Sequence, residues 1–289
     1  MCRSGRATLK NELLDQFPSV TNIDDVLKQK PDVAFVCTPS ALHIDSALPL
    51  LKSGCHLFIE KPVSHNLNQC DQMIQIAKEK KLTTLVGFQF RFHPVLNQIK
   101  EMIDANMLGR IVSVHVHWGE YLPDWHPWED YKGSYAARPD MGGGVALTLC
   151  HPIDYLRWLI GEIETMQATQ SPLHVLDTKV DESVLFSLRF ASGVIGSVYV
   201  DFVQRPPRHT MMIVAEKGTV TWNNATSTAE ISLVGQNTYS IEPPQSFERN
   251  NLFADEVKHF VDCVKHHKTT CVPLDHGVET LNLILKAMS

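Results

Sequence analysis

The sequence predicts an α/β domain with a parallel sheet, followed by an α+β domain in which a mostly antiparallel sheet carries helices on one face. The first prediction rests on short apolar runs that alternate with helical patterns, because parallel strands are covered on both faces. The second rests on later strands in which apolar and polar residues alternate between short turns. We expect the first domain to span residues 1–90 and the second to span residues 91–289.

Three apolar runs in the first domain are rich in β-branched and aromatic residues and predict parallel strands: Asp32–Thr38, Cys55–Glu60 and Thr83–Phe88. Between them, residues 41–52 and 66–80 carry apolar side chains at three- and four-residue spacing, which predicts helices. Gly54 follows the first helix, where a glycine readily adopts the left-handed conformation that ends a helix. Strands and helices therefore alternate as in a Rossmann-type sheet.

The second domain is expected to combine amphipathic helices with alternating strands. Helices are predicted over Pro94–Ala105, Val145–Leu159, Asn251–His266 and Leu274–Ala287. Strands are predicted over residues 111–118, 183–190, 193–203, 211–216 and 218–222. Turn signals such as Glu216-Lys217-Gly218 separate neighbouring strands, which favours antiparallel pairing.

Composition restricts the classes of partner. A formal net charge of -6, without a long Lys/Arg run, argues against a nucleic-acid partner and favours small-molecule ligands. No apolar run approaches the roughly 20 residues of a membrane span, so no membrane partner is expected. Seven cysteines, an odd number without a CxxC pair, fit a reducing compartment, and we expect the cytoplasm.

The motif Glu60-Lys61-Pro62 ends a predicted parallel strand. Open α/β sheets bind their ligands at the carboxyl ends of the strands. Burial and neighbours can tune a lysine at this place to hold or move a proton, while the proline ring fixes the backbone. The alternative is a surface lysine that happens to follow a strand.

The motif Gly142-Gly143-Gly144 precedes a predicted helix that carries His151 and Asp154. Their i, i+3 spacing places imidazole and carboxylate on one helix face, so that the acid could orient the ring or tune its pKa. The two residues are therefore a candidate acid/base pair. In the alternative, the glycines form an entry turn, and the His and Asp cap the helix or pair locally.

The loop Tyr121–Tyr135 gathers aromatic, acidic and imidazole side chains, among them Trp125 and His126. Aromatic rings can cover the C–H faces of a sugar while polar groups bind its hydroxyls. The loop is therefore a candidate carbohydrate-binding lip. Aromatic loops also form subunit contacts, and the sequence leaves both interpretations open.

Two further groups of residues lie close to predicted strands. His115 and His117 share one strand face, but no third ligand has a convincing spacing, so we predict an interface and no metal site. Arg91 comes just beyond a parallel strand. It is a candidate to contact an anionic ligand or to anchor the domain junction.

Together these motifs resemble the glucose-fructose oxidoreductase/inositol dehydrogenase (Gfo/Idh/MocA) family. The matching features are, in order, VCTPSALH, EKP, GFQFRFHP, GGG with a downstream HxxD, and EKGTV. They extend over essentially the whole chain. Residues 121–161 further resemble a branch associated with sugars of bacterial surface glycans.

The resemblance implies roles for individual residues. Lys61 would lie beside the nicotinamide and the substrate hydroxyl, and His151 would be the acid/base. Cofactor-lining positions would be Thr38, Pro39, His43 and Glu60, and substrate-binding positions would be Arg91, Trp125, His126 and Asp154. Many relatives place an aspartate four residues before the histidine, and that position is Leu147 here, with Asp154 as the candidate substitute.

The start of the chain is expected to lie inside a dinucleotide-binding domain, because no GxGxxG loop precedes Asp32. The resemblance implies that such a loop and its helix come before a short basic segment. Arg3 and Ser4 would then flank the adenosine ribose, and an arginine there favours a 2'-phosphate. NADP or NAD is therefore the expected cofactor.

The predicted activity is hydride transfer between a nicotinamide cofactor and a hydroxyl or carbonyl carbon of a sugar or sugar derivative, with His151 as base and Lys61 stabilising the oxyanion. The alternative is a catalytically impaired, truncated family member that acts only as a sugar-binding or assembly module. A homo-oligomer through the second sheet is implied by the resemblance.

Overall fold

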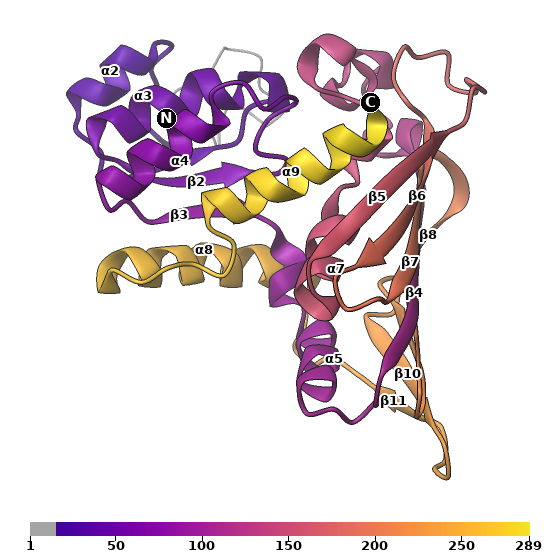
Figure 1. Ribbon diagram of the computed structural model, residues 1–289. Coiled ribbons are helices and arrows are strands. Elements are labelled where there is room, and N and C mark those ends of the chain that lie inside the picture. The colour runs from indigo at the N-terminus through magenta and orange to yellow at the C-terminus, as the bar shows by residue number, and fades with distance from the viewer. Residues whose placement is uncertain (1–15) are drawn as a thin grey trace.

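A computed structural model describes residues 16–289, which form two sheet-based halves (Figure 1). The first half contains a parallel sheet of three strands in the order β1-β2-β3. These strands are β1 Val33–Val36, β2 His56–Glu60 and β3 Thr84–Gly87. Phe35 lies opposite Phe58, and Phe58 lies opposite Leu85, so the strands run in register. The three parallel strands are confirmed.

Helices cover this sheet, and two of them follow β1 and β2 as the sequence predicted, whereas the helix before β1 was not predicted. Their bounds are α2 Ile23–Lys28, η1 Ser40–Leu42, α3 His43–Ser53 and α4 Cys70–Glu79. Gly54 ends α3 with φ of 93°, as predicted. The prediction that the next helix starts at residue 66 was wrong, because the Asn66 side chain accepts a hydrogen bond from the Asn68 amide and forms a turn instead.

Eight strands form the second sheet in the order β11-β10-β9-β8-β4-β7-β6-β5. Their bounds are β4 Ile111–Tyr121, β5 Ile163–Gln170, β6 Ser183–Phe190, β7 Ile195–Asp201, β8 Val203–Ala215, β9 Gly218–Asn223, β10 Thr228–Leu233 and β11 Tyr239–Ile241. Only β4 and β7 pair in parallel, so the sheet is mostly antiparallel, as predicted. The sequence did not predict β5, β10 and β11, which lie at or near the sheet edges.

Helices and short turns lie against the inner face of this sheet. The helices are α5 Pro94–Asp104, α6 Val145–Thr148 and α7 His151–Ile160, and the turns are η2 Gln89–Phe92, η3 Leu122–Asp124, η4 Tyr131–Gly133, η5 Tyr135–Ala137 and η6 Pro139–Met141. The prediction of one helix over Val145–Leu159 was wrong. The chain leaves the helical conformation at Leu149 and starts again at His151, with Pro152 in the first turn of α7, where proline is tolerated.

The last two helices, α8 Arg249–His266 and α9 Leu274–Met288, return to the parallel sheet (Figure 1). The Val86 amide donates a hydrogen bond to the Val272 carbonyl over 2.9 Å. A Cβ on Gly277 would lie 2.5 Å from the Val86 side chain, so only glycine allows this close approach of α9 to β3. The boundary near residue 90 stays a prediction.

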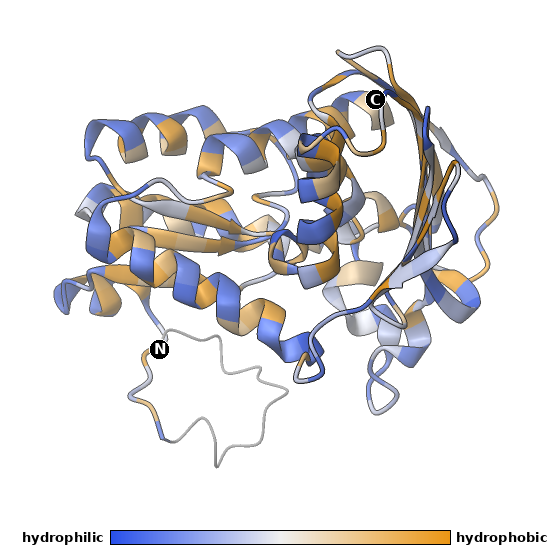
Figure 2. Ribbon diagram, turned by 90° about the horizontal axis from the view of Figure 1, so that it is seen from below, coloured by the Kyte–Doolittle hydropathy of each residue, from blue (hydrophilic) through white to orange (hydrophobic). Residues whose placement is uncertain are grey.

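The hydrophobic core is continuous across both halves. Figure 2 shows apolar residues along the parallel strands and on the helix faces turned towards them. Phe58 and Phe260 are buried, and their rings meet edge to face at 5.9 Å, which joins β2 to α8. Within residues 16–289, no helix combines the length and the apolar character needed to cross a membrane.

Candidate active site

Two sequence motifs from the two halves meet at the carboxyl end of the parallel sheet. The Lys61 ammonium donates a hydrogen bond of 2.6 Å to the Thr148 carbonyl. Thr148 ends α6, and three residues later His151 begins α7. The structure therefore brings the lysine of the first half to the histidine-bearing segment of the second.

A buried histidine holds the backbone on which Lys61 stands. The two ring nitrogens of His43 lie 2.9 Å from the Pro62 carbonyl and 2.7 Å from the Thr38 carbonyl. His43 is only 1% exposed, so its ring ties together the segments after β1 and β2. Its role as a direct cofactor ligand stays a prediction.

The glycine motif lets α6 reach this place. A Cβ on Gly142, where φ is 77°, would lie 2.7 Å from the His65 Cβ in the first half. A Cβ on Gly144 would collide with the Asp181 carboxylate. That carboxylate accepts a hydrogen bond of 2.8 Å from the Ala146 amide and so caps α6. The glycines are therefore an entry turn and also a close contact between the halves.

Lys61 remains a cation in these surroundings. Burial lowers the pKa of Lys61, but Tyr135, Cys150, Glu60 and Glu120 raise it, and the net result is a raised pKa. Sequence reasoning missed Glu120 as part of the site. Glu120 accepts a hydrogen bond of 2.7 Å from the Trp118 indole, and the two-residue period of β4 places both on one face. That period is the signal that could have found Glu120.

His151 is buried against aromatic rings. Its ring centroid lies 5.5 Å from Phe88, 5.1 Å from Phe90 and 5.7 Å from Trp118. Burial first, and then the positive charge of Lys61, holds the pKa of His151 well below its usual range, with smaller effects from His209 and Arg249. The imidazole is therefore neutral near pH 7 and able to accept a proton.

The predicted pairing of Asp154 with His151 is not formed. Both stand in the first turn of α7, but the Asp154 carboxylate accepts hydrogen bonds from Arg91 Nε at 2.8 Å and from Arg91 Nη2 at 2.9 Å. Both side chains are buried, and the bidentate pair joins η2 to α7. Arg91 thus anchors the junction, and a substrate contact by Arg91 or Asp154 stays a prediction.

The aromatic loop divides into a packed and an exposed part. Trp125 is half-buried, and its ring meets Phe202 edge to face at 5.6 Å. His126 is exposed and lies beside Trp128, which is 74% exposed. The assignment of Trp125 and His126 to a sugar therefore stays a prediction.

The residues at the carboxyl end of the parallel sheet suit a nicotinamide cofactor. Thr38 is exposed after β1, and Pro39 and Glu60 are half-buried. Burial raises the pKa of Glu60, although the neighbouring Lys61 lowers it. Thr148 Oγ1 and His151 Nδ1 are buried and have no hydrogen-bond partner among the described residues, as expected of atoms that a polar ligand completes. Arg3 and Ser4 lie outside the described residues.

The histidines of β4 form hydrogen bonds rather than a cluster. His115 Nδ1 lies 2.9 Å from the Ser197 hydroxyl, and His117 Nε2 lies close to the Gln204 carbonyl oxygen. Across the part of the chain that the structure describes, no group of three or more metal-ligating side chains occurs.

Comparison with known proteins gives two family matches. Residues 6–88 match the model described as an oxidoreductase family with an NAD-binding Rossmann fold. Residues 96–221 match the model of the GFO/IDH/MocA C-terminal domain. The two matches follow each other in the order of the two halves.

Individual relatives agree with these matches. Levoglucosan dehydrogenase of Pseudarthrobacter phenanthrenivorans is 30% identical over 194 residues, which cover 58% of this chain and 49% of the relative. The 1,5-anhydro-D-fructose reductase of Ensifer adhaerens is 23% identical, over 91% of this chain and 78% of the relative.

Solved structures share the fold. A levoglucosan dehydrogenase in complex with NADH and L-sorbose superimposes with a TM-score of 0.88 at 18% identity, over 99% of this chain and 86% of the other. The two matched family models correspond to the two halves of the chain. The first of them is an NAD-binding domain, in agreement with the expected cofactor, NAD or NADP. The chain belongs to the Gfo/Idh/MocA family of oxidoreductases.

Proposed function

We propose that the protein is an NAD(P)-dependent oxidoreductase that transfers hydride to or from a carbon of a sugar or sugar derivative that carries a hydroxyl or carbonyl group. The observation that carries the proposal is the 2.6 Å contact of Lys61 with Thr148, beside His151. Relatives named for activity on sugars or sugar derivatives, such as levoglucosan dehydrogenase and 1,5-anhydro-D-fructose reductase, support the substrate class.

The two side chains divide the work of moving one proton. His151 is neutral because its pKa is lowered, so it accepts the proton of the substrate hydroxyl. Lys61 keeps its charge because its pKa is raised, so it stabilises the negative charge that develops on the oxygen. Bound NAD or NADP supplies the hydride acceptor or donor. In the reverse direction, His151 returns the proton to the oxygen while Lys61 stabilises the negative charge on it.

The surroundings of His151 exclude water from this step. Phe88, Phe90 and Trp118 contact the imidazole and leave it 2% exposed. A low-dielectric wall strengthens the attraction between Lys61 and a developing oxyanion. Further proposed contacts are Thr38, Pro39, His43 and Glu60 for the cofactor, and Arg91, Trp125, His126 and Asp154 for the sugar.

We also propose a homo-oligomer formed through the outer face of the eight-stranded sheet. Leu185 is 44% exposed, Ile195 is 57% exposed and Met212 is 39% exposed on that face. Apolar side chains gathered on one sheet face favour a partner surface. The described cysteines are free thiols, which fits the proposed cytoplasmic location.

The test begins with cofactor binding, by fluorescence titration of NADPH and NADH. Oxidation is then assayed with levoglucosan, L-sorbose and other neutral sugars. Lys61→Met and His151→Asn should each lower kcat/KM by about 100-fold or more, because each removes a group that acts on the reacting oxygen. Lys52→Met, an exposed lysine of α3, is the matched control and should keep full activity.

Thermal unfolding of all variants separates loss of chemistry from loss of fold. Micromolar cofactor binding and a sugar-dependent change in NAD(P)H absorbance would support the proposal. Absence of cofactor binding up to millimolar concentration would refute it and favour the sugar-binding or assembly module. Full activity of both Lys61→Met and His151→Asn would refute the assigned roles.

A further inference from the structure

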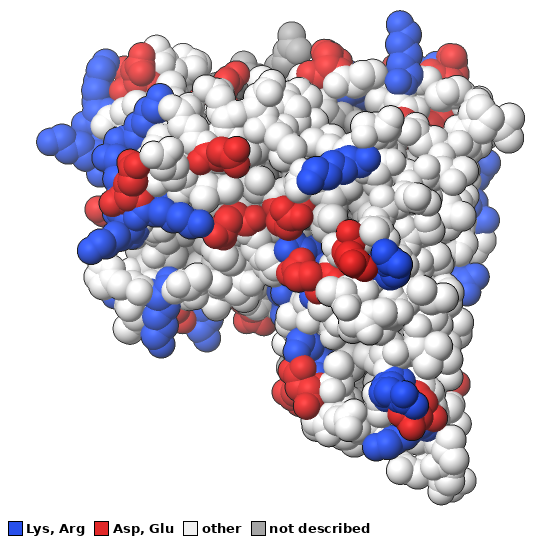
Figure 3. Space-filling model, in the orientation of Figure 1, with Lys and Arg blue, Asp and Glu red and all other residues white. Residues whose placement is uncertain are grey.

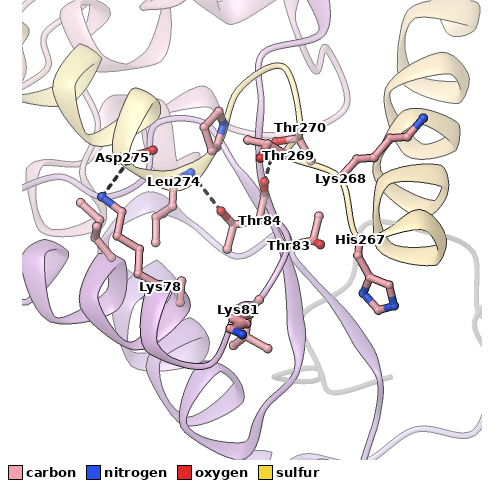
Figure 4. Close-up of a pocket in the computed structure, with 14 residues that line it drawn as sticks. Lys78, Lys81, Thr83, Thr84, His267, Lys268, Thr269, Thr270, Leu274 and Asp275 are labelled. Carbon is pink, nitrogen blue, oxygen red and sulfur yellow. Dashed lines mark hydrogen bonds and ion pairs between the residues drawn. The ribbon is translucent and has the colours of Figure 1, made fainter.

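The two densest basic runs of the chain meet at the end of the parallel sheet opposite Lys61. These runs are KEKK at residues 78–81 and KHHK at residues 265–268. Between them lies a cavity of about 480 Å³, lined at the amino end of β3 by Thr83 and Thr84 (Figure 4). It shares no lining residue with the contact between Lys61 and Thr148.

The charge of this cavity is opposite to that of the whole chain. Its ionisable lining residues are Lys78, Lys81, His267, Lys268 and Asp275. The chain carries a formal net charge of -6, yet a single carboxylate faces three lysines here. Lysine and arginine side chains also gather at this end of the molecule, at the left of Figure 3. The local charge therefore favours an anion.

The lysines at the opening are not engaged by the protein. Among the described residues, the ammonium groups of Lys81 and Lys268 have no hydrogen-bond or ion-pair partner. Figure 4 shows Lys81 on one side of Thr83, and His267 and Lys268 on the other. Lys78 pairs with Asp275 at 3.1 Å, but both side chains are exposed, and such a pair contributes little and exchanges readily.

Helix capping does not account for these lysines. Basic residues often stand at helix C-termini because they neutralise the last carbonyls. Here backbone amides already donate to those carbonyls. The Leu82 amide donates to the Ala77 carbonyl over 2.8 Å, and the Lys268 amide donates to the Cys263 carbonyl over 2.9 Å. Lys81 and His267 adopt left-handed φ values of 54° and 51° to allow this, and their side chains remain available.

The floor of the cavity is rigid and polar. The Thr270 hydroxyl donates to the Thr84 carbonyl over 2.6 Å, and the Leu274 amide donates to the Thr84 hydroxyl over 3.0 Å. Thr83 is 8% exposed and adds a further hydroxyl. A volume of about 480 Å³ lies within the range of small-molecule sites, which suits a small metabolite better than an extended polymer.

We propose that this cavity binds a small phosphorylated molecule, whose phosphate draws in the flexible, exposed side chains of Lys81 and Lys268 from its two sides and accepts a hydrogen bond from Thr83. A phosphate dianion matches two ammonium groups and a hydroxyl in charge and in donor number. It would also compete with Asp275 for Lys78. The site is separate from the catalytic edge, because none of its lining residues takes part in the contact between Lys61 and Thr148.

Calorimetric titration of the full chain with inorganic phosphate, and in parallel with pyrophosphate, tests this proposal. Lys81→Ala/Lys268→Ala should weaken binding by at least about tenfold, because each lysine supplies a charged hydrogen bond. Lys179→Ala/Lys258→Ala removes the same charge from two exposed lysines outside the cavity and should change the affinity less than about twofold. Chloride at equal ionic strength controls for screening.

A third variant separates the cavity from the catalytic edge. Lys61→Met should leave phosphate binding unchanged, because Lys61 lies at the other end of the sheet. The proposal would be overturned by the absence of saturable binding up to millimolar phosphate, or by equal weakening in both double variants. Loss of binding in Lys61→Met alone would also overturn it, since the phosphate would then occupy the catalytic edge.

Discussion

Two cations join the halves of the molecule, the buried Arg91 and the half-buried Lys61, and they are partnered differently. Arg91 meets the Asp154 carboxylate with two hydrogen bonds, of 2.8 and 2.9 Å. Lys61 donates one hydrogen bond to a neutral carbonyl, and no carboxylate of the described residues lies within ion-pair distance. A matched pair holds structure together, whereas an unmatched cation retains charge for a ligand.

The same difference extends to the neighbours of the two cations. Arg157, which follows Asp154 on α7, is fully engaged by Glu162, Thr280 and the His276 carbonyl. Around Lys61, the Thr148 hydroxyl and His151 Nδ1 have no partner within residues 16–289. Buried polar atoms without partners are costly, and a bound substrate or cofactor would satisfy them. Four substitutions can break or sharpen this comparison.

The largest effect on stability is expected for Arg91→Ala. It leaves the Asp154 carboxylate buried and uncompensated, which should lower the free energy of unfolding by about 3–5 kcal/mol. Urea denaturation measures the loss. Arg189→Ala is the control, since its pair with Glu164 is exposed and should contribute less than about 1 kcal/mol. Equal losses in the two variants would contradict the structural role of the buried pair.

The next effect is expected at Glu256, which is 1% exposed on α8. Burial, and then the negative charges of Glu60 and Asp154, raises the pKa of Glu256 to about 9. The folded state therefore holds a proton that the unfolded state releases, so stability falls as pH rises from about 4.5 to about 9.

Glu256→Gln should remove this pH dependence, which amounts to about 1.4 kcal/mol per pH unit. The variant should gain a few kcal/mol over the wild type between pH 5 and pH 8, as measured by urea denaturation at several pH values. Glu101→Gln, at an exposed position of α5, should gain nothing. A parallel pH profile for Glu256→Gln and the wild type would show that Glu256 is ionised in the fold.

A smaller effect of opposite sign is expected from the buried histidines. Burial lowers the pKa of His93 to about 4, and it also lowers the pKa values of His151 and His209. Between about pH 6.5 and about pH 4 the His93 imidazole is protonated in the unfolded state but not in the folded state. The free energy of unfolding therefore falls as pH drops from about 6.5 to about 4.

His93→Asn should reduce this acid sensitivity by about 1.4 kcal/mol per pH unit. His93 caps α5 by accepting from the Val95 amide at 3.2 Å, and asparagine is also a good cap, so the helix should be kept. Urea denaturation between pH 4 and pH 7 measures the slope. An unchanged slope would mean that His93 is protonated in the folded protein.

The smallest effect on stability is expected for Thr148→Val. Removing a hydroxyl without a partner should change the free energy of unfolding by less than about 1 kcal/mol, yet kcat/KM should fall by about tenfold if the hydroxyl binds the ligand. Thr280→Val, which removes a hydroxyl bonded to Arg157, should instead cost about 1–3 kcal/mol and spare activity. The reverse outcome would contradict the distinction between partnered and unpartnered groups.

Local patterns in the sequence were sufficient to predict much of this architecture. Continuous apolar runs predicted the three parallel strands, and Gly54 predicted the end of α3. The motifs that contain Lys61 and His151 were found because each follows a recognisable strand or glycine turn. The break of the helix at Leu149 could have been read from Pro152, which favours the start of a helix.

Contacts between residues far apart in the chain could not be predicted from local sequence patterns. Asp154 forms its hydrogen bonds with Arg91, which lies 63 residues away in the sequence, and not with His151 on its own helix. Residue spacing within a helix gives no information on such a long-range contact. The packing of α9 on β3 through Gly277 is equally non-local, as is the approach of Glu120 to Lys61. Edge strands such as β5 are mostly exposed, so they lack the apolar signal of a buried strand.

The central claim is that Lys61 and His151 act on the same substrate oxygen. A double-variant cycle measures this directly, by comparing kcat/KM of Lys61→Met, His151→Asn and the combined variant. If both side chains act in one proton transfer, kcat/KM of the combined variant should be nearly the same as kcat/KM of the less active single variant. Losses that simply multiply would contradict the claim, because the two residues would then contribute independently.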